Sequence, residues 1–166
     1  MTNDRDEVLD AVLEAWDRNN TIMLNLLRAV PEVALDARAT PSSPTVAQQF
    51  MHLHHERLIS VSEEAAEYAE SVPQAEWAAE RDPQRIAALL VESAGVVGRA
   101  ARGRVLAGQP LDRNFGHPLL MVQFLVWHEG YHHGQIKLAL KISGKPISDD
   151  EAGPLTWDVW RRRLTP

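Results

Sequence analysis

The chain has 166 residues, a usual length for one folded unit, and we expect a single domain over residues 1–166. Hydrophobic residues make up 45% and charged residues 24%, which is typical of a folded globular protein rather than a disordered one. Acidic residues outnumber basic ones by 23 to 17, and the net charge of −6 argues against nucleic-acid binding, which needs a basic surface. The absence of cysteine excludes disulfides, thiolate metal sites and cysteine nucleophiles.

The sequence carries no membrane or secretion signal that we can identify. Its longest apolar stretch, residues 119–127, is interrupted by Gln123 and is too short to span a bilayer. The first residues, MTNDRDE, are acidic and lack the apolar region of a signal peptide. These features predict a cytoplasmic protein that does not associate with membranes.

The first two long segments have helical patterns. In about residues 5–30, apolar side chains recur every three or four positions, as in an amphipathic helix. The second segment opens at Ser43, which can cap a helix, and Pro44, which suits its first turn. Helical character continues from there to about Glu70. The sequence therefore predicts two helices separated by a loop rich in proline and serine.

Two further segments carry helix start and stop signals. The third begins at the Asp-Pro pair at residues 82–83 and ends near Ala107, before Gly108. Its internal glycines weaken the helical preference. The fourth begins at the His-Pro pair at residues 117–118 and ends at the Gly-Lys-Pro run at residues 144–146. We expect a helix over each segment.

The last part of the chain predicts a short terminal helix. Residues 148–151 form the pattern of a capping box, and a final helix is expected over residues 155–160. No segment shows the two-residue alternation of a β-strand, so we expect no sheet. Four long helices with loops of this length predict an all-α protein built as a four-helix bundle.

Histidines are distributed unevenly along the chain. Of the seven histidines, His117 stands at a predicted helix start and is expected to cap it. The other six fall on the second and fourth predicted helices, at His52, His54, His55, His128, His132 and His133. This distribution makes the two helices the place to look for a metal site, because only His, Asp and Glu are available as ligands.

The fourth predicted helix places two imidazoles side by side. His128 and His132 are four residues apart, so they share one helix face, and their nitrogens can converge on one ion. The rest of that face is mostly apolar and should point into the bundle. A buried neutral imidazole needs a polar partner. Either a divalent cation or hydrogen bonds to backbone and water would satisfy both rings.

The second predicted helix leaves the choice of a third ligand open. His54 lies on an apolar stripe, whereas His52 lies on a more polar one, so periodicity slightly favours His54 as the inward residue. Periodicity does not decide which of them reaches a metal ion. Glu129 and His55 are candidates for moving protons near such a site. Glu129 can also be read as a partner of a ligand or as a solvated helix charge.

Residues 128–132 also match the H-E-x-x-H pattern of zinc peptidases. Glu151 follows at a distance that resembles the third ligand of gluzincins. Two features argue against a peptidase. The sequence predicts no β-sheet to hold a peptide substrate, and the capping box at residues 148–151 already accounts for Glu151.

Three stretches resemble the DinB/YfiT-like family of metalloenzymes. They are TVAQQFMHL at residues 45–53, WHEGYHHGQI at residues 127–136, and GKP at residues 144–146 together with WDVWR at residues 157–161. The resemblance implies a bundle in up-down-down-up order with one long crossover connection. It also implies a metal site of His52, His128 and His132, usually with zinc or nickel, and a homodimer.

The resemblance implies a chemistry as well. Some members of this family are transferases or isomerases that use a low-molecular-weight thiol, such as bacillithiol or mycothiol. The resulting hypothesis is a divalent-metal-dependent enzyme, a hydrolase or a thiol-dependent transferase, that acts on a small molecule. One alternative is a non-catalytic metal-binding module of a stress response. Another is a helical interaction protein whose histidines are part of the core.

Overall fold

The computed structural model describes residues 4–161, and within them every regular element is helical. The long helices are α1 (Asp4–Ala29), α2 (Val46–Glu64), α3 (Pro83–Ala107) and α4 (Pro118–Ile142). The short elements are α5 (Asp149–Leu155), α6 (Trp157–Arg161) and the 3₁₀ turns η1 (Glu32–Ala34) and η2 (Ala66–Tyr68). No helix in this described part is long and apolar enough to cross a bilayer. The all-α prediction is confirmed.

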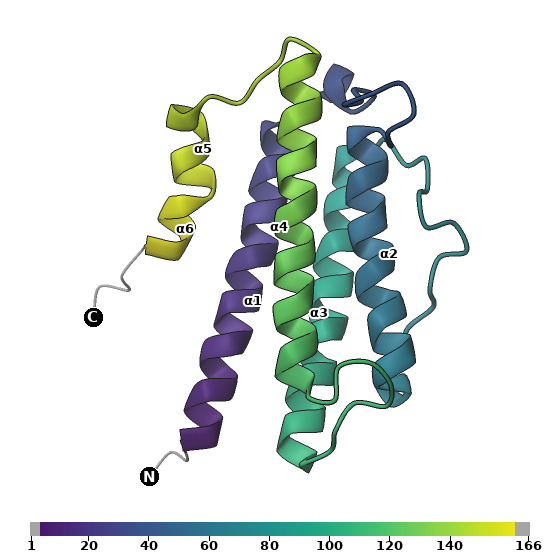
Figure 1. The fold of residues 1–166 in the computed structure, drawn as a ribbon, viewed down its shortest axis with the longest axis vertical. Coiled ribbons are helices and arrows are strands. Elements are labelled where there is room, and N and C mark those ends of the chain that lie inside the picture. Colours follow the sequence, from purple (N-terminus) through teal and green to yellow (C-terminus); the bar gives the residue numbers. More distant parts are fainter. Residues whose placement is uncertain (1–3, 162–166) are drawn as a thin grey trace.

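The four long helices pack in the order up, down, down, up (Figure 1). Helices α2 and α3 run in the same direction, so the chain between them must return along the length of the bundle. Residues 65–82 make this crossover and pass beside α2 on the outside of the bundle (Figure 1). Helix α4 contacts α1, α2 and α3. The arrangement matches the topology that the family resemblance implies.

Helix α2 begins later than the sequence predicts. Thr45, not Ser43, is its N-cap. The hydroxyl of Thr45 accepts a hydrogen bond from the backbone amide of Gln48 at 3.1 Å. The side-chain oxygen of Gln48 accepts one from the amide of Thr45 at 3.0 Å. This reciprocal pair satisfies two amides at once, so it outcompetes the single cap that Ser43 offers.

Helix α2 also ends earlier, at Glu64 rather than near Glu70. The buried carboxylate of Glu64 accepts hydrogen bonds from the backbone amides of residues 113–114, which lie far along the chain. A tertiary contact therefore marks the helix end, which local sequence signals do not reveal. Helix α3, in contrast, begins after Asp82 and ends at Gly108, which has φ +68°, as predicted.

The core consists of two apolar clusters with a polar layer between them. One cluster surrounds Trp16, near the start of α1 and the end of α2, and the other surrounds Phe50, near the end of α1 and the start of α2. Seven buried polar residues lie on the four helices near the level where the two clusters meet. They are Asn19, His52, His54, Arg57, Ser93, Glu129 and His132. Most of the candidate site residues therefore belong to this polar layer.

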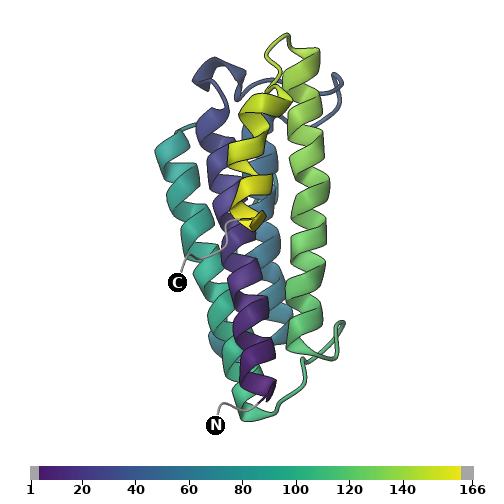
Figure 2. The same ribbon diagram turned by 90° about the vertical axis from the view of Figure 1, so that its left-hand side faces the viewer.

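Helices α5 and α6 lie across α1 beside α4 (Figure 2). The guanidinium of Arg18 on α1 donates hydrogen bonds to the carbonyls of Val159 and Trp160, at 3.1 Å and 2.7 Å. The sequence predicts one short helix over residues 155–160, whereas the structure has two, which meet in a bend at Thr156. The Ser148 capping box starts α5 at Asp149, so the helical part of this segment begins six residues earlier than the predicted start at residue 155.

Candidate metal centre

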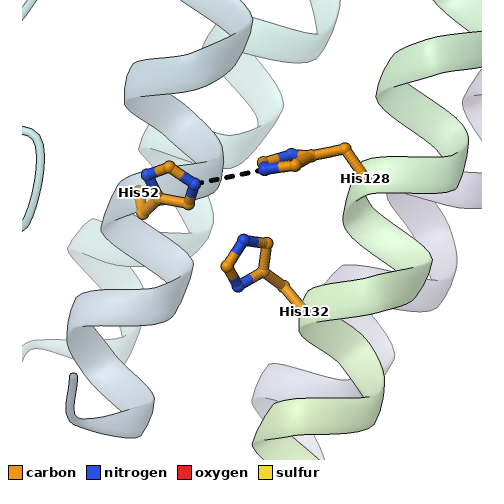
Figure 3. A group of neighbouring side chains, drawn as sticks. All are labelled: His52, His128 and His132. Carbon is orange, nitrogen blue, oxygen red and sulfur yellow. Dashed lines mark hydrogen bonds between the residues drawn. The ribbon is translucent and has the colours of Figure 1, made fainter. Parts of the chain in front are cut away.

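Three histidine side chains from two helices meet in the seam between α2 and α4 (Figure 3). One ring nitrogen from each of His52, His128 and His132 lies within 4.8 Å of the others. The Nε2 atoms of His52 and His128 are 3.2 Å apart, and one nitrogen of His132 points toward this pair. The four-residue spacing on α4 places two of the rings one above the other. The third ring comes from the facing helix.

The separation of the nitrogens suits a shared metal ion. Two nitrogens bound to one tetrahedral zinc ion at about 2.0–2.1 Å lie about 3.3 Å apart. The 3.2 Å between the Nε2 atoms of His52 and His128 is close to this value. The same distance also permits an N–H···N hydrogen bond when one ring donates. The cluster can therefore hold a divalent metal ion with little rearrangement of its two closest rings.

Acceptors lie on the outer side of two of the rings. Nδ1 of His132 donates to the side-chain oxygen of Gln49 at 3.4 Å. Nδ1 of His52 lies 3.0 Å from a carboxylate oxygen of Glu76, although its N–H is not aligned for a hydrogen bond. An acceptor beside Nδ1 favours the tautomer with its proton there and leaves Nε2 free as a ligand. Metal-binding histidines commonly have such outer partners.

Burial keeps the rings of His52 and His132 neutral at physiological pH. The pKa of His52 is lowered to about 4, mainly because the ring is removed from water and secondly because of the charge on a protonated His128. The carboxylate of Glu76 opposes this shift. The pKa of His132 is also lowered to about 4, first by burial and then by His128 and His52. A neutral imidazole is the form that binds a metal ion. The protein therefore presents these two side chains in their ligand state above about pH 5.

Aromatic side chains surround the cluster and restrict the rings. Trp77 stacks on His52 with the ring centroids 4.2 Å apart and an angle of 7° between the planes. Phe124 stacks on His128 with centroids 5.8 Å apart. Tyr131 meets His132 edge to face at 5.2 Å. These contacts limit ring rotation and displace water from one side of each imidazole.

Glu76 and Trp77 are site residues that the sequence analysis missed. Both lie in the crossover between α2 and α3, which the sequence marks only as a break between two helices. The carbonyl of Trp77 accepts a hydrogen bond from the side-chain amide of Gln48 at 3.2 Å, which ties this part of the crossover to α2. A tryptophan in a crossover rich in alanine and glutamate was the available signal.

The structure separates His52 from the other histidines of α2. His54 is buried, but its Nδ1 donates to the carbonyl of Leu89 on α3 at 2.9 Å, so it is a core histidine bonded to backbone. The inward position that periodicity favours for His54 is confirmed, yet the residue that joins the cluster is His52. His55 is half-buried outside the cluster. His117 caps α4 as expected.

Glu129 lies inside the bundle with 1% of its surface exposed, so the reading of this residue as a solvated helix charge is wrong. Arg57 donates to both carboxylate oxygens, at 2.6 Å and 2.8 Å, and Asn19 donates to one of them at 2.7 Å. The carboxylate is thus held in a buried ion pair. The proton-transfer roles considered for Glu129 and His55 stay predictions.

Glu151 does not act as the third metal ligand that the peptidase hypothesis requires. Glu151 is exposed, and one of its carboxylate oxygens accepts hydrogen bonds from the amide and hydroxyl of Ser148, at 2.8 Å and 2.7 Å, as the capping box predicts. Among residues 4–161, the potential metal-binding cluster contains His52, His128 and His132 without Glu151. The same range has no β-strand on which a peptide substrate could be held.

Comparison of the chain with protein-family models, with curated proteins and with solved structures finds no match. The structure adds two features that agree with the resemblance to the DinB/YfiT-like family, an all-α bundle and a buried three-histidine cluster. Membership of that family stays a prediction.

Proposed function

We propose that His52, His128 and His132 bind one divalent metal ion, zinc or nickel, and that the protein is a metal-dependent enzyme catalysing hydrolysis or thiol transfer. The observation that carries the proposal is the convergence of three ring nitrogens within 4.8 Å of one another inside a helical bundle. Without an ion, Nε2 of His52 and Nε2 of His128 can pair with each other, but this pairing does not include His132. One ion satisfies all three.

The ligand set favours catalysis over a purely structural role. Structural zinc sites are usually closed by four protein ligands, often cysteines, whereas catalytic sites keep a position for water or substrate. This chain has no cysteine, and the cluster supplies three ligands. When bound, a divalent ion at such a site supplies Lewis-acid chemistry, which activates a water molecule or a thiol for attack.

Several residues of the chain would position the reactants. The rings of Trp77, Phe124 and Tyr131 enclose the histidines and would shield a substrate from water. The carboxylate of Glu76 is about half exposed and lies 3.0 Å from Nδ1 of His52, where its negative charge favours a proton on that nitrogen. In thiol transfer the sulfur would come from a co-substrate, because the protein has no thiol of its own.

Metal content tests the first half of the proposal. Protein purified without an affinity tag, stripped with a chelator and titrated with zinc or nickel by calorimetry should bind one ion per chain. His132→Ala should weaken this binding at least a hundredfold. His133→Ala removes the neighbouring imidazole, which is outside the cluster, and should bind as the wild type does. Equal binding by the wild type and His132→Ala would exclude the site.

Activity tests the second half. The metal-loaded protein would be assayed with ester, amide and thiol-conjugate substrates, in the presence and absence of a low-molecular-weight thiol. Turnover that disappears in His132→Ala and returns with added metal in the wild type supports an enzyme. Stoichiometric metal binding without turnover of any of these substrates favours the alternative, a non-catalytic metal-binding module.

A further inference from the structure

A cavity lies on the side of α4 that faces away from the histidine cluster. It has a volume of about 270 Å³, is open to solvent, and is lined by residues of α1, α4 and the C-terminal α5–α6 segment. These elements lie next to one another in Figure 2. Gly130 and His133 contribute from α4. At about 100° per residue, Gly130 falls about 160° from both His128 and His132 on the helix, and His133 falls about 100–140° from them. The cavity is therefore separate from the candidate metal centre.

The walls of the cavity are largely apolar and aromatic. Met23 of α1 lines it, together with Trp157 and Trp160 of the C-terminal segment. Both tryptophans are about half exposed, at 48% and 44%. A Cβ atom added at Gly130 would meet no atom within 4 Å, so the missing side chain leaves room at this point. These features describe a slot that suits a flat apolar group.

Two polar side chains of the cavity have unused hydrogen-bonding capacity. Nε2 of His133 is buried and has no hydrogen-bond partner among the described residues. Asn19 donates to Glu129 through its amide nitrogen and also lines the cavity, where its carbonyl oxygen can accept a hydrogen bond from a ligand. A buried polar atom without a partner destabilises the protein by about 1–3 kcal/mol. A ligand with a polar group would supply the missing partner.

The lining also indicates the charge and size of the ligand. Among the described residues, no Asp, Glu, Lys or Arg lines this cavity. A charged ligand would lose its hydration there without gaining an ionic partner. A volume of about 270 Å³ is at the lower end of ligand-binding pockets, which corresponds to a molecule of one or two rings.

We propose that this cavity binds a small, neutral, planar aromatic molecule that carries one hydrogen-bonding group. The ring lies against Trp157 and Trp160, and the polar group faces Asn19 and His133. Gly130 leaves the space that the ring occupies. Binding at this site does not require the metal centre, so it is tested on metal-free protein.

The experiment uses p-cresol as the neutral probe and benzoate as a charged ring of similar size. Binding to the metal-free full chain is followed in ¹H–¹⁵N NMR spectra through the indole N–H signals, assigned with single Trp→Phe variants. p-Cresol should shift the signals of Trp157 and Trp160 in a saturable way and leave that of the buried Trp16 unchanged. Benzoate should bind at least tenfold more weakly.

Two matched variants locate the site. Gly130→Leu fills the cavity and should weaken p-cresol binding at least tenfold. Gly134 is exposed and has open space around it, as Gly130 does, but it does not line the cavity, so Gly134→Leu should bind p-cresol as the wild type does. Circular dichroism checks that both variants fold. The proposal is overturned if p-cresol does not bind, if Gly130→Leu binds it unchanged, or if benzoate binds equally well.

Discussion

The guanidinium of Arg57 and the carboxylate of Glu129 form a two-point ion pair in the middle of the bundle. The two contacts measure 2.6 Å and 2.8 Å, and the side chains are 0% and 1% exposed. Arg57 also donates to the carbonyl of Leu90 at 2.7 Å and to the side chain of Asn20 at 3.0 Å. The pair therefore links α2 to α4, the two helices that carry the histidine cluster, and ties both to α1 and α3.

Removing one partner of this ion pair should strongly destabilise the protein. Glu129→Leu leaves the Arg57 guanidinium buried without a counter-charge, and the free energy of unfolding should fall by about 3–5 kcal/mol. The double variant Arg57→Met/Glu129→Leu removes both charges and should be more stable than Glu129→Leu alone. Urea unfolding of the metal-free proteins measures both values. A double variant less stable than Glu129→Leu would contradict this expectation, and would show that Arg57 stabilises the fold through its other contacts, to Leu90 and Asn20.

The stability of the metal-free protein should depend on pH between about 6.5 and 4. His52 and His132 have pKa values lowered to about 4, so in this range the unfolded chain binds protons that the folded chain does not. The free energy of unfolding should therefore be highest above pH 6.5, fall as the pH decreases, and stop falling from this cause below about pH 4. Each ring contributes up to roughly 3 kcal/mol.

Urea midpoints measured from pH 4 to pH 7 in the presence of a chelator test this dependence. The double variant His52→Gln/His132→Gln should show a clearly smaller change across the range. His117→Gln, at an exposed helix cap, should leave the pH profile unchanged. A double variant with the wild-type profile would assign the pH dependence to other groups.

Glu76 should tune the metal affinity without being a ligand. Its carboxylate lies 3.0 Å from Nδ1 of His52, where it can orient the ring and increase the basicity of Nε2. Glu76→Gln should therefore weaken zinc binding about tenfold with one ion still bound per chain. Glu70→Gln is the matched control, because it removes an equal charge from the same crossover at a residue paired with Arg99. Equal affinity of the two variants would contradict a positioning role for Glu76.

Local sequence signals predicted the ends of α3, which local contacts determine, but placed the cap of α2 at Ser43 instead of Thr45. Asp82 accepts a hydrogen bond from the amide of Gln84, and Gly108 adopts the left-handed conformation that ends a helix. The end of α2 was not predictable in this way, because Glu64 bonds to a loop almost fifty residues further along the chain. Helix ends set by contacts within one turn can therefore be read from the sequence, whereas ends set by contacts between distant parts of the bundle cannot.

The same distinction applies to the candidate site. The spacing of His128 and His132 predicts that both rings share a face, because one helix alone determines it. The choice between His52 and His54 was not decided by periodicity, since both are buried and they differ only in the helix that each one faces. Nor could periodicity reveal the burial of Glu129, which depends on a partner on another helix, Arg57.

We expect the protein to form a homodimer through an exposed apolar stripe on α4. Leu120, Trp127, Tyr131 and Leu138 are 58%, 66%, 56% and 49% exposed. Their spacings of seven, four and seven residues place them on one helix face, as in a helix–helix seam. A two-fold axis beside α4 would bury the stripe on both copies at once, and exposed apolar patches of this kind mark interaction surfaces. We therefore expect a second copy of the chain to cover this stripe.

Light scattering coupled to gel filtration measures the mass of the particle in solution. The wild type should run as a dimer, and Trp127→Glu/Tyr131→Glu should shift it to a monomer with unchanged helix content. Val91→Glu places a charge at a similarly exposed apolar position, 54% exposed on α3, and should remain dimeric. A wild type that is monomeric at micromolar concentration would rule out this interface. A dimer unaffected by the α4 substitutions would also rule it out, because the energy of association is assigned to Trp127 and Tyr131, the aromatic pair at the middle of the stripe.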